Sequence, residues 1–563
     1  MPNANTPDQR LQRAVALHQA GQVADAVLLY EKIVKKSPDA AGVLNLLGIA
    51  RFQLGNLPQA ATAMRRALRL NPALPNADYN LGRILQAQKQ FDEALQCYEK
   101  AIGYSPDDVE ILNNLGTVLA ALDRHAEAIP VYRRAVALQP NAADVWFNLG
   151  NACSAEYLYA EAVAAYERTL ALRPDHVPVL RPMASALIAL NRYEEAIRHL
   201  RRVTDLEPGD GSVFIGLGIA LAASGREAEA LESFDRALAL KVEAADALWN
   251  KGVVLLAYGR FAEGWALFKH RWTAKGIEGR HRPYPQPPWD GAPVSGTLLV
   301  WAEQGVGDEV LLSSMLPDLR GRAERIVVEA DARLVPLFER SFAGITVVPR
   351  ASELYAGPVT VQAPLGDLGQ FLRPDAASFR SAADGYLAVD SQRAEDLRAR
   401  LAGDGRRVVG LSWVSKNRTS SAAKSAHLVD FLPVLQMPNC RFIDLQYGDT
   451  SEERAQLAAT HGIEVERVPD LDTMNDIDGL SALIAACDIV VTVSNTTAHL
   501  TGAQGKTGWV LLPYAFGRFW YWQQAGSRSP FYNSLRLCRP HKDQAWSDVI
   551  ASIAPEIRQH LER

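Results

Sequence analysis

The first half of the chain carries a period of 34 residues, and this period constrains the fold more than any other feature. Small residues recur on it without insertion at Ala14, Gly48, Gly82, Gly116, Gly150, Ala184, Gly218 and Gly252. A second small residue follows each of them by twelve positions, from Ala26 to Gly264, and a large residue such as Tyr30 follows four positions later. A unit this short cannot bury its apolar side alone, whereas stacked copies can. The pattern therefore predicts an array of stacked repeats.

Each unit reads as two short helices. The paired small residues allow the helices to approach closely, and proline ends the second helix in six units because it lacks a backbone N–H. These residues resemble the tetratricopeptide repeat (TPR) over residues 7–272, with seven full units and a partial eighth. The resemblance implies an α-helical superhelix whose concave groove binds a protein partner.

Asparagine recurs at the sixth position of four units, at Asn80, Asn114, Asn148 and Asn250. An amide offers a donor and an acceptor to any peptide bond. The TPR superhelix of O-GlcNAc transferase, which this array resembles, uses an asparagine ladder to hold substrate backbones, so we expect these residues to bind the acceptor protein. The alternative is that asparagine is simply common at this repeat position, and Pro182 and Gly216 interrupt the series.

The second half alternates strands and helices. Five prolines within residues 281–293 predict a rigid connector over residues 273–293. The predicted strands are TLLVWA, RIVVEA, ITVVP, VTVQA, RVVGLSW, RFIDLQY, IEVERV, DIVVTVS and GWVLLP. Helical stretches between them indicate two parallel sheets covered by helices, joined by a polar hinge at residues 398–407. Ligands of such sheets bind beyond the carboxyl ends of the strands.

Three short motifs do not support the chemistry they suggest. GVGDEV lacks the third glycine of a dinucleotide fingerprint, because Val310 stands there. GKT at residues 505–507 lacks the glycine that a phosphate-binding loop needs, because Leu500 stands there. Asp470-Leu471-Asp472 has the D-x-D spacing of metal-dependent sugar transferases, but single matches of this kind are frequent by chance. We therefore expect no metal and no resident cofactor.

Four segments together resemble one family. WAEQGVGDEVLLSSMLPDL, GLSWVSKNRTSSAAKSAHL, FIDLQYGD and DIVVTVSNTTAHLTGAQGKTGWVLLP occur in this order in heptosyltransferase-like glycosyltransferases. The whole chain resembles bacterial proteins in which such a domain follows a TPR array, some of which glycosylate flagellin. The resemblance implies a GT-B fold of two Rossmann-like α/β lobes. The first, acceptor lobe spans residues 294–397 and the second, nucleotide-sugar lobe spans residues 408–563, whose C-terminal helix returns to brace the first lobe.

Asp308 is the predicted catalytic residue. It matches the aspartate that the family uses as general base, and a carboxylate can take the proton of an acceptor hydroxyl as that hydroxyl attacks a sugar. The alternative is that Asp308 only caps the N-terminus of a helix, where carboxylates are favourable. Glu303 is a weaker candidate assigned to acceptor binding, and Glu309 is expected to face solvent.

The predicted donor-binding residues follow strands of the second lobe. Hydroxyls and unpaired N–H groups at a strand-to-helix turn can hold a phosphate without a metal, and the resemblance places Lys424 on that phosphate. The full set is Lys424, Gln446, Tyr447, Ser494, Asn495, Thr496, Thr497 and His499. Helix capping, core packing and exposed loops are the alternatives for these side chains. Lys416 is expected to be solvated, and the aromatic stretch 516–524 is expected in the core unless it stacks on the ligand.

Composition sets the remaining limits. A net charge of −5 gives no nucleic-acid footprint, and no apolar run approaches the length of a membrane span. Five scattered cysteines fit a cytoplasmic location. The expected function is inverting, metal-independent transfer of a sugar from a nucleotide-sugar to Ser or Thr of a protein held by the TPR groove. The alternatives are an inactive TPR scaffold and a lipopolysaccharide-type glycosyltransferase.

Overall fold

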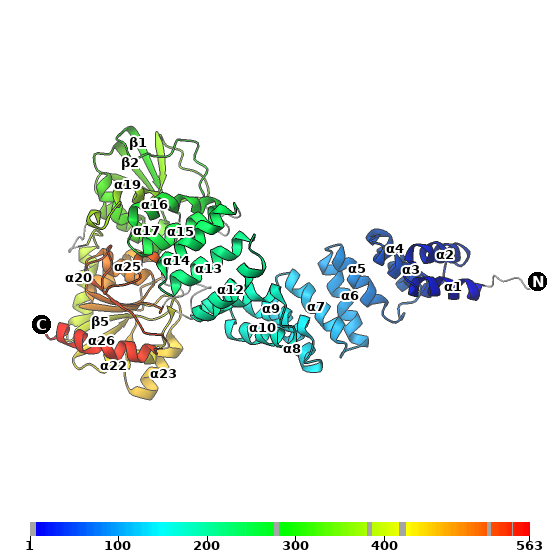
Figure 1. Cartoon of the computed structure of the whole chain (residues 1–563). Coiled ribbons are helices and arrows are strands. Elements are labelled where there is room, and N and C mark those ends of the chain that lie inside the picture. The colour runs from blue at the N-terminus through cyan, green and yellow to red at the C-terminus, as the bar shows by residue number, and fades with distance from the viewer. Residues whose placement is uncertain are drawn as a thin grey trace, which may run out of the picture. The chain divides into compact units, whose positions relative to one another are not determined.

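The computed structural model describes residues 7–241, 244–274, 281–303, 305–379, 385–415, 424–514, 519–542 and 544–563. The chain divides into two compact units, Met1–Leu190 and Asn191–Arg563 (Figure 1). The first unit contains TPR helices alone. The second contains the last TPR helices and an α/β domain.

The first unit is a series of helix pairs, as the 34-residue period predicts. Its helices are α1 (Pro7–Gln19), α2 (Val23–Lys36), α3 (Ala41–Gln53), α4 (Leu57–Leu70), α5 (Ala77–Ala87), α6 (Phe91–Tyr104), α7 (Val109–Ala121), α8 (His125–Leu138), α9 (Ala143–Ala155), α10 (Tyr159–Leu172), η1 (Val177–Val179) and α11 (Leu180–Ala189). Glycine lets the two helices of a unit pack closely. A Cβ added to Gly116 would lie 2.6 Å from the Tyr132 ring, and one on Gly150 would lie 2.5 Å from the Tyr166 ring.

The second unit begins with the last repeats. Their helices are α12 (Tyr193–Leu206), α13 (Gly211–Ala223), α14 (Glu227–Ala239), α15 (Ala244–Ala257), α16 (Phe261–Phe268) and η2 (Lys269–Thr273). The α16 helix packs into the α/β domain, where the Trp265 ring lies so close to Gly369 that an added Cβ would come within 2.4 Å of it. The repeats and the α/β domain of this unit therefore share one core.

Two parallel sheets form the α/β domain. The first has the order β3-β2-β1-β4, and the second has the order β10-β9-β8-β5-β6-β7. The strands are β1 (Val294–Trp301), β2 (Ala323–Ala330), β3 (Ile345–Pro349), β4 (Val361–Pro364), β5 (Arg407–Ser412), β6 (Cys440–Asp444), β7 (Val465–Glu466), β8 (Ile489–Val493), β9 (Gly508–Leu511) and β10 (Leu535–Cys538). Nine of these are predicted strands, and β10 is an addition that the sequence did not indicate.

Helices surround both sheets. In the first lobe they are α17 (Val306–Leu312), η3 (Ser313–Leu319), η4 (Ala332–Leu334), α18 (Val335–Ser341), η5 (Leu365–Leu368), α19 (Gly369–Leu372) and η6 (Ala376–Ser378). In the second lobe they are α20 (Ser391–Ala402), which packs on α24, and η7 (Leu428–Phe431), α22 (Leu432–Leu435), α23 (Ser451–His461), α24 (Ile477–Ala486), α25 (Thr496–Ala503), η8 (Trp520–Trp522) and α26 (Trp546–Leu561). Strands such as β8 are buried along their whole length, which is why they read as continuous apolar runs.

Two details of the predicted arrangement are wrong. The polar stretch 398–407 is not a hinge throughout, because α20 continues to Ala402 and β5 starts at Arg407. The C-terminal helix α26 packs on α22 and η7 of the second lobe, instead of returning to the first (Figure 1). Its apolar face, including Val549 and Ile550, belongs to the core of the second sheet.

The segment between β9 and β10 makes the return contact instead. Trp520 packs edge-on against Trp265 of α16 with 5.1 Å between ring centroids, and Phe531 packs against Phe379 of the first lobe at 4.8 Å. Of the predicted aromatic stretch, residues 516–518 lie outside the described residues. Tyr521 and Trp522 are buried, as the core alternative predicts.

The proline-rich connector is also part of the fold. Trp289 donates its backbone N–H to the carbonyl of Gln362 at 2.8 Å, and the N–H of Gln362 donates to Pro287 at 3.0 Å. These bonds place the connector along the edge of β4.

Candidate functional site

The switch points of the two sheets define the candidate site. In the first sheet β1 lies between β2 and β4, and in the second β5 lies between β6 and β8. A parallel sheet opens a crevice beyond the carboxyl ends of the strands where its order reverses. The loop from β1 to α17 leaves the first switch point, and the turn from β8 to α25 leaves the second.

The helices that leave these two points contact each other. A Cβ added to Gly307 of α17 would lie 3.1 Å from Cδ2 of His499 and 3.5 Å from the hydroxyl of Thr496, both on α25. Glycine therefore allows the N-terminal turns of α17 and α25 to meet. The predicted acceptor side and the predicted donor side are in this way brought together by packing between the lobes.

Asp308 lies in the first turn of α17 and is partly exposed. Desolvation raises the pKa of its carboxyl to about 6, against the lowering effects of a backbone hydrogen bond from Gly305 and of the Lys424 charge, while Glu303 raises it further. Gly305 is the N-cap residue of α17 and Asp308 lies in its first turn, so the position also fits the capping role that the sequence left as the alternative. A carboxylate with this pKa is mostly ionised at pH 7 and can still accept a proton.

Lys424 approaches Asp308 from the second lobe. It is 1% exposed, and its Nζ lies 3.6 Å from the centroid of the Phe519 ring. Desolvation lowers the pKa of its amine to about 8, and the negative charge of Asp308 opposes this change. The site therefore contains one buried cation and one carboxylate contributed by opposite lobes. Lys416 lies outside the described residues.

The turn between β8 and α25 offers hydrogen-bond donors. Neither Thr496 N–H nor Thr497 N–H has a backbone or side-chain partner among the described residues. The buried hydroxyl of Thr497 also has no partner there, and Thr496 is half-buried at the contact with Gly307. Unpaired N–H groups at a helix N-terminus favour an anion.

Asn495 and Gln446 hold the backbone of this turn. Asn495 caps α25 and donates its amide to the Ser412 hydroxyl at 2.8 Å and to the Val414 carbonyl at 3.2 Å. Gln446 accepts from the N–H groups of Trp413 and Val414 at 3.0 and 2.8 Å. These contacts tie the ends of β5, β6 and β8 together. Tyr447 is half-buried beside Gln446, and ligand binding by these three residues stays a prediction.

Aromatic side chains fix Ser494 and His499. The indole N–H of Trp522 donates to the Ser494 hydroxyl at 2.7 Å, and the Trp522 ring stacks on His499 with 5.1 Å between centroids. His499 Nδ1 lies 3.0 Å from the Tyr532 hydroxyl. Burial and the nearby Lys424 charge lower the pKa of His499 to about 3, so its imidazole is neutral. His499 therefore packs against neighbouring aromatic side chains, which is the alternative to contact with the nucleotide.

The two glutamates beside Asp308 have protein partners. Glu303 receives two hydrogen bonds from the Arg271 guanidinium, at 2.7 and 2.8 Å, and a third from the Gly366 N–H at 2.9 Å. Glu303 is thus already hydrogen-bonded within the protein. It could bind an acceptor only in addition to these partners or in place of them, so its role in acceptor binding stays a prediction. The prediction that Glu309 faces solvent is wrong. It is 1% exposed, pairs with Arg350 at 3.0 Å and accepts the Asp331 N–H at 2.8 Å.

Each ladder asparagine is half-buried, and three have described partners. The Asn114 amide donates to the Tyr79 hydroxyl at 3.3 Å, and the Asn148 amide donates to Oδ1 of Asn113 at 2.9 Å. Both bonds connect neighbouring repeats of the first unit. In the second unit Asn250 donates to the Asp246 carbonyl at 2.8 Å. Asn80 lies on α5, so Asn80, Asn114 and Asn148 occupy equivalent positions of successive repeats.

Sequence reasoning missed the supporting residues of the site. Arg271 and Tyr532 come from segments that the sequence did not single out. Phe519 and Trp522 lie in the aromatic stretch 516–524, whose contacts with Lys424 and Ser494 the sequence did not indicate. An arginine at the end of a repeat array or a cluster of aromatic residues gives no sign of which loop it will support. Among the described residues, no group of three or more His, Cys, Asp or Glu side chains is arranged to hold a metal ion. In the same part of the chain, no helix combines the length and apolarity that crossing a membrane requires.

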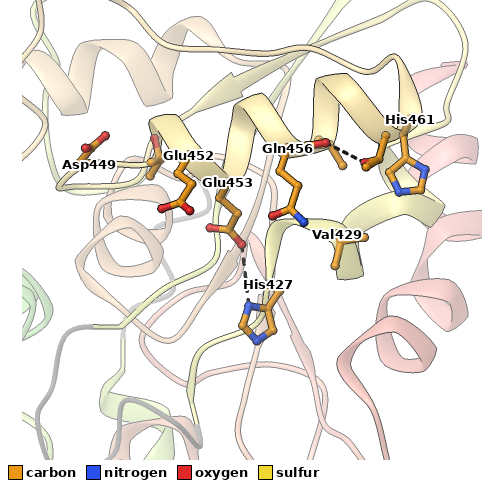
Figure 2. Close-up of a pocket in the computed structure, with 10 residues that line it drawn as sticks. His427, Val429, Asp449, Glu452, Glu453, Gln456 and His461 are labelled. Carbon is orange, nitrogen blue, oxygen red and sulfur yellow. Dashed lines mark hydrogen bonds and ion pairs between the residues drawn. The ribbon is translucent and has the colours of Figure 1, made fainter.

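A separate cavity of about 640 Å³ lies on the second lobe, between α23 and η7. Figure 2 shows Asp449, Glu452 and Glu453 along one side of it, with His427 opposite. Glu453 is held in place by the Leu428 N–H at 2.6 Å and the Trp413 indole at 2.7 Å. An acidic wall of this kind repels a diphosphate. The unpaired donors at α25 are therefore a better phosphate site than this cavity.

Comparisons with known proteins confirm the repeats. Two tetratricopeptide repeat models match the chain, one at residues 11–75, 79–143, 126–177 and 228–269 and the other at residues 154–215. Protein FlbA of Caulobacter vibrioides is 30% identical over 318 residues, which cover 52% of each chain. Cellulose synthase 2 operon protein C of Komagataeibacter xylinus is 35% identical over 100 residues, which cover 17% of this chain and 8% of that protein. The chain thus spans about half the length of the first relative and far less of the second.

Solved structures match the helical part. MamA from Desulfovibrio magneticus is 20% identical and covers 31% of this chain and 99% of its own, with a TM-score of 0.30. PilF of Pseudomonas aeruginosa is 20% identical and covers 36% of this chain and 93% of its own, with a TM-score of 0.32.

Proposed function

We propose that the protein is a cytoplasmic glycosyltransferase of the GT-B type that moves a sugar from a nucleotide-sugar to a Ser or Thr hydroxyl of a protein bound by the TPR array. The observation that carries this proposal is the meeting of Asp308 and Lys424 at the facing switch points of two parallel sheets, beside the unpaired N–H groups of α25. The resemblance of the four segments to heptosyltransferase-like enzymes supports the same reaction.

The residues suit an inverting displacement. The acceptor oxygen attacks the anomeric carbon from one side as the bond from that carbon to the phosphate oxygen breaks on the other. Asp308 takes the hydroxyl proton, which makes it the general base. The electron pair of the broken bond leaves on the nucleoside diphosphate. The Lys424 charge and the N-terminus of α25 stabilise that anion, so the reaction needs no metal ion.

In this proposal the TPR array binds the acceptor protein. Repeats of this class present their surface to protein partners, and the asparagines of α5, α7 and α9 offer hydrogen bonds that do not depend on the partner's sequence. Flagellin is the acceptor that the resemblance suggests.

Nucleotide binding is the first test of the proposal. The thermal unfolding midpoint of the full chain would be measured against ADP, GDP, UDP and CMP, each with and without its sugar. Binding at about a hundred times the dissociation constant adds about 2.7 kcal/mol, which corresponds to a rise of roughly 2–4 °C. The proposal expects such a rise with one nucleotide class, its loss in Lys424→Ala and its retention in Asp308→Asn.

The control for this test is Lys542→Ala, which removes an exposed lysine of the same lobe. If no nucleotide raises the midpoint, the chain is better described as a TPR scaffold whose α/β domain has lost its chemistry. A lipopolysaccharide-type transferase would bind the nucleotide and would transfer sugar equally well without residues 7–190.

A further inference from the structure

The third repeat carries an acidic residue at a position where most of the repeats carry an apolar one. Four residues before the small residue of each period, most repeats carry a large apolar side chain, namely Leu44, Leu112, Trp146, Leu180, Phe214 and Leu248. The first repeat has Arg10, and the third has Asp78. Asp78 lies at the start of α5 and is only 9% exposed. The chain thus places a carboxylate where six repeats carry an apolar side chain, three of them fully buried and three half-buried.

This carboxylate has no partner in the part of the chain that the structure describes. It forms no hydrogen bond and no ion pair there, although the Lys100 charge is near enough to act on it. Desolvation raises the pKa of Asp78, and Lys100 opposes that rise. A carboxylate that is largely removed from water and has no partner costs stability. A polar partner from outside the chain would remove that cost.

Asp78 lines a cavity that opens to solvent. The cavity has a volume of about 190 Å³ and lies between the ends of α5, α6 and α7. Tyr79 and Tyr104 contribute rings to its wall, Asn76 and Ser105 contribute polar groups, and no lysine or arginine is among its lining residues. Tyr104 is 72% exposed. The Tyr79 hydroxyl is occupied by Glu110 and Asn114, and the Arg83 guanidinium lies 5.7 Å from the centroid of its ring, so Tyr104 offers the more open ring of the two.

We propose that this cavity receives a lysine or arginine side chain of the protein that the repeats bind. The Asp78 carboxylate pairs with the cation, and the exposed Tyr104 ring attracts it through its negative face. The apolar stem of the basic side chain fills the space that a leucine occupies in the other repeats. This inference rests on protein binding by the repeats, and it does not require sugar transfer.

The position also carries a stability argument. Asp78→Leu restores the residue type of the other repeats, removes a buried charge and reduces the cavity. When a residue serves binding but reduces stability, its replacement raises stability and weakens binding. The Asp78→Leu protein is therefore expected to unfold at a higher temperature than the wild type and to lose the preference for peptides that contain Lys or Arg.

The experiment selects peptides from a display library with the full-length chain. The library consists of random nonapeptides whose central residue is fixed as Lys, Arg, norleucine or Glu. The wild type is expected to enrich the Lys or Arg peptides over the norleucine peptides by about tenfold or more. Asp78→Asn, which keeps the shape of the side chain, and Asp78→Leu should both remove this preference. Asp92→Asn, which removes an exposed carboxylate of α6, should keep it.

Several results would overturn the inference. These are equal enrichment of norleucine and basic peptides by the wild type, an unchanged basic preference in Asp78→Asn, or a lower unfolding temperature of Asp78→Leu. Competition by free arginine or spermidine, without selection of basic peptides, would assign the cavity to a small amine and also overturn it. Because the readout is peptide selection, it is unaffected if the chain fails to bind a nucleotide.

Discussion

Two neighbouring carboxylates show how the environment of a residue decides its role. Glu309 is enclosed by Arg350 and the Asp331 backbone, and burial still raises its pKa to about 7. Asp308, one residue earlier, is partly exposed and lies within reach of the Lys424 charge from the other lobe. Glu309 is therefore engaged by contacts within the first lobe, whereas Asp308 keeps an exposed part.

The rate of transfer should depend on pH through Asp308 and Lys424. A base works only when it is deprotonated, so kcat/KM should rise with pH with a midpoint near the Asp308 pKa of about 6. It should fall again near pH 8, where the ligand-free Lys424 loses its charge and binds the donor less well. Initial rates from pH 5 to 9.5 would show this bell shape. An acid limb that remains at the same pH in Asp308→Glu and Asp308→Asn would remove Asp308 from the role.

Lys424 should be a site where function reduces stability. Its folded pKa of about 8 lies below the unfolded value of 10.5, so burying the charged amine costs free energy at pH 7 and the cost declines as pH rises from 8 to 10.5. Lys424→Met should therefore raise the free energy of unfolding at pH 7 by about 1–3 kcal/mol, with a smaller gain at pH 10. Unfolding can be followed by tryptophan fluorescence, because ten of the eleven tryptophans lie in the second unit.

The comparison for that measurement is Lys542→Met, which should change stability little because Lys542 is exposed. A Lys424→Met protein that is less stable than the wild type and binds nucleotide normally would contradict the assignment.

The sequence predicted which residues follow the strands, but not what they contact. The position of Asp308 follows from the glycine turn after a strand. The burial of Glu309 does not, because it depends on Arg350, which lies 41 positions further along the chain. Likewise, the indole that holds Ser494 comes from the segment after β9, and nothing near Trp522 in the sequence indicates that contact.

At the level of elements, the end of the repeat array supports the loop that carries Asp308. Arg271 of η2 is buried and binds Glu303 through two hydrogen bonds and Asp367 at 2.7 Å. Its guanidinium also lies 4.4 and 4.2 Å from the ring centroids of Phe268 and Trp272. Glu303 directly precedes the turn into α17. The contact therefore connects the last repeat, through Glu303, to the segment that leads to Asp308.

Removing Arg271 should be costly. Arg271→Met leaves Glu303 buried without its cation, which typically costs about 3–5 kcal/mol of folding free energy. Arg271→Lys should restore little of it, since an ammonium cannot make the paired hydrogen bonds of a guanidinium. Urea unfolding of the second unit would measure both values. Arg536→Met is the matched control, because its ion pair with Glu556 is exposed and should contribute less than about 1 kcal/mol.

A double substitution completes that test. If Arg271 acts through Glu303, the Arg271→Met/Glu303→Gln protein should recover part of the lost stability. Additive losses in the double variant would show that the two residues act independently.

Helices and strands could be predicted from the sequence where a local pattern of residues determines them. The strands are continuous apolar runs and were found, except for β10, whose four residues LRLC are too short to stand out. The extent of α20 and the packing of α26 were mispredicted for a different reason. A helix whose apolar face has been identified still has several surfaces that could cover it, and only the folded core decides among them.

On the scale of the whole molecule, one chain joins a TPR array to an α/β domain that carries the proposed transfer site. The repeats were fully predictable, because their period leaves one way to bury the apolar faces. The ligand of the repeats was not predictable, because asparagines at equivalent positions can hydrogen-bond to side chains of neighbouring repeats as well as to a peptide. The bonds from Asn114 to Tyr79 and from Asn148 to Asn113 show that the amides are already partly used.

Replacing the asparagines should nevertheless weaken the use of the acceptor protein and leave binding of the nucleotide-sugar donor unchanged. The Asn114→Ala/Asn148→Ala protein should lower kcat/KM for a protein acceptor by roughly 5- to 30-fold, at about 1 kcal/mol for each lost hydrogen bond. Its nucleotide affinity should be unchanged. Asn141→Ala, an exposed residue between repeats, is the control. Unchanged transfer in the double variant would leave these residues with a structural role alone.

The most direct test of the transfer site is the intact mass of flagellin that is co-expressed with the full chain. The wild type and Glu324→Gln, which alters an exposed acid of the first lobe, should both add sugar mass to flagellin. Asp308→Asn should fold and bind nucleotide normally but should transfer about 10²- to 10⁴-fold more slowly, as expected on loss of a general base. Unmodified flagellin with the wild type, or equal modification with Asp308→Asn, would contradict the account.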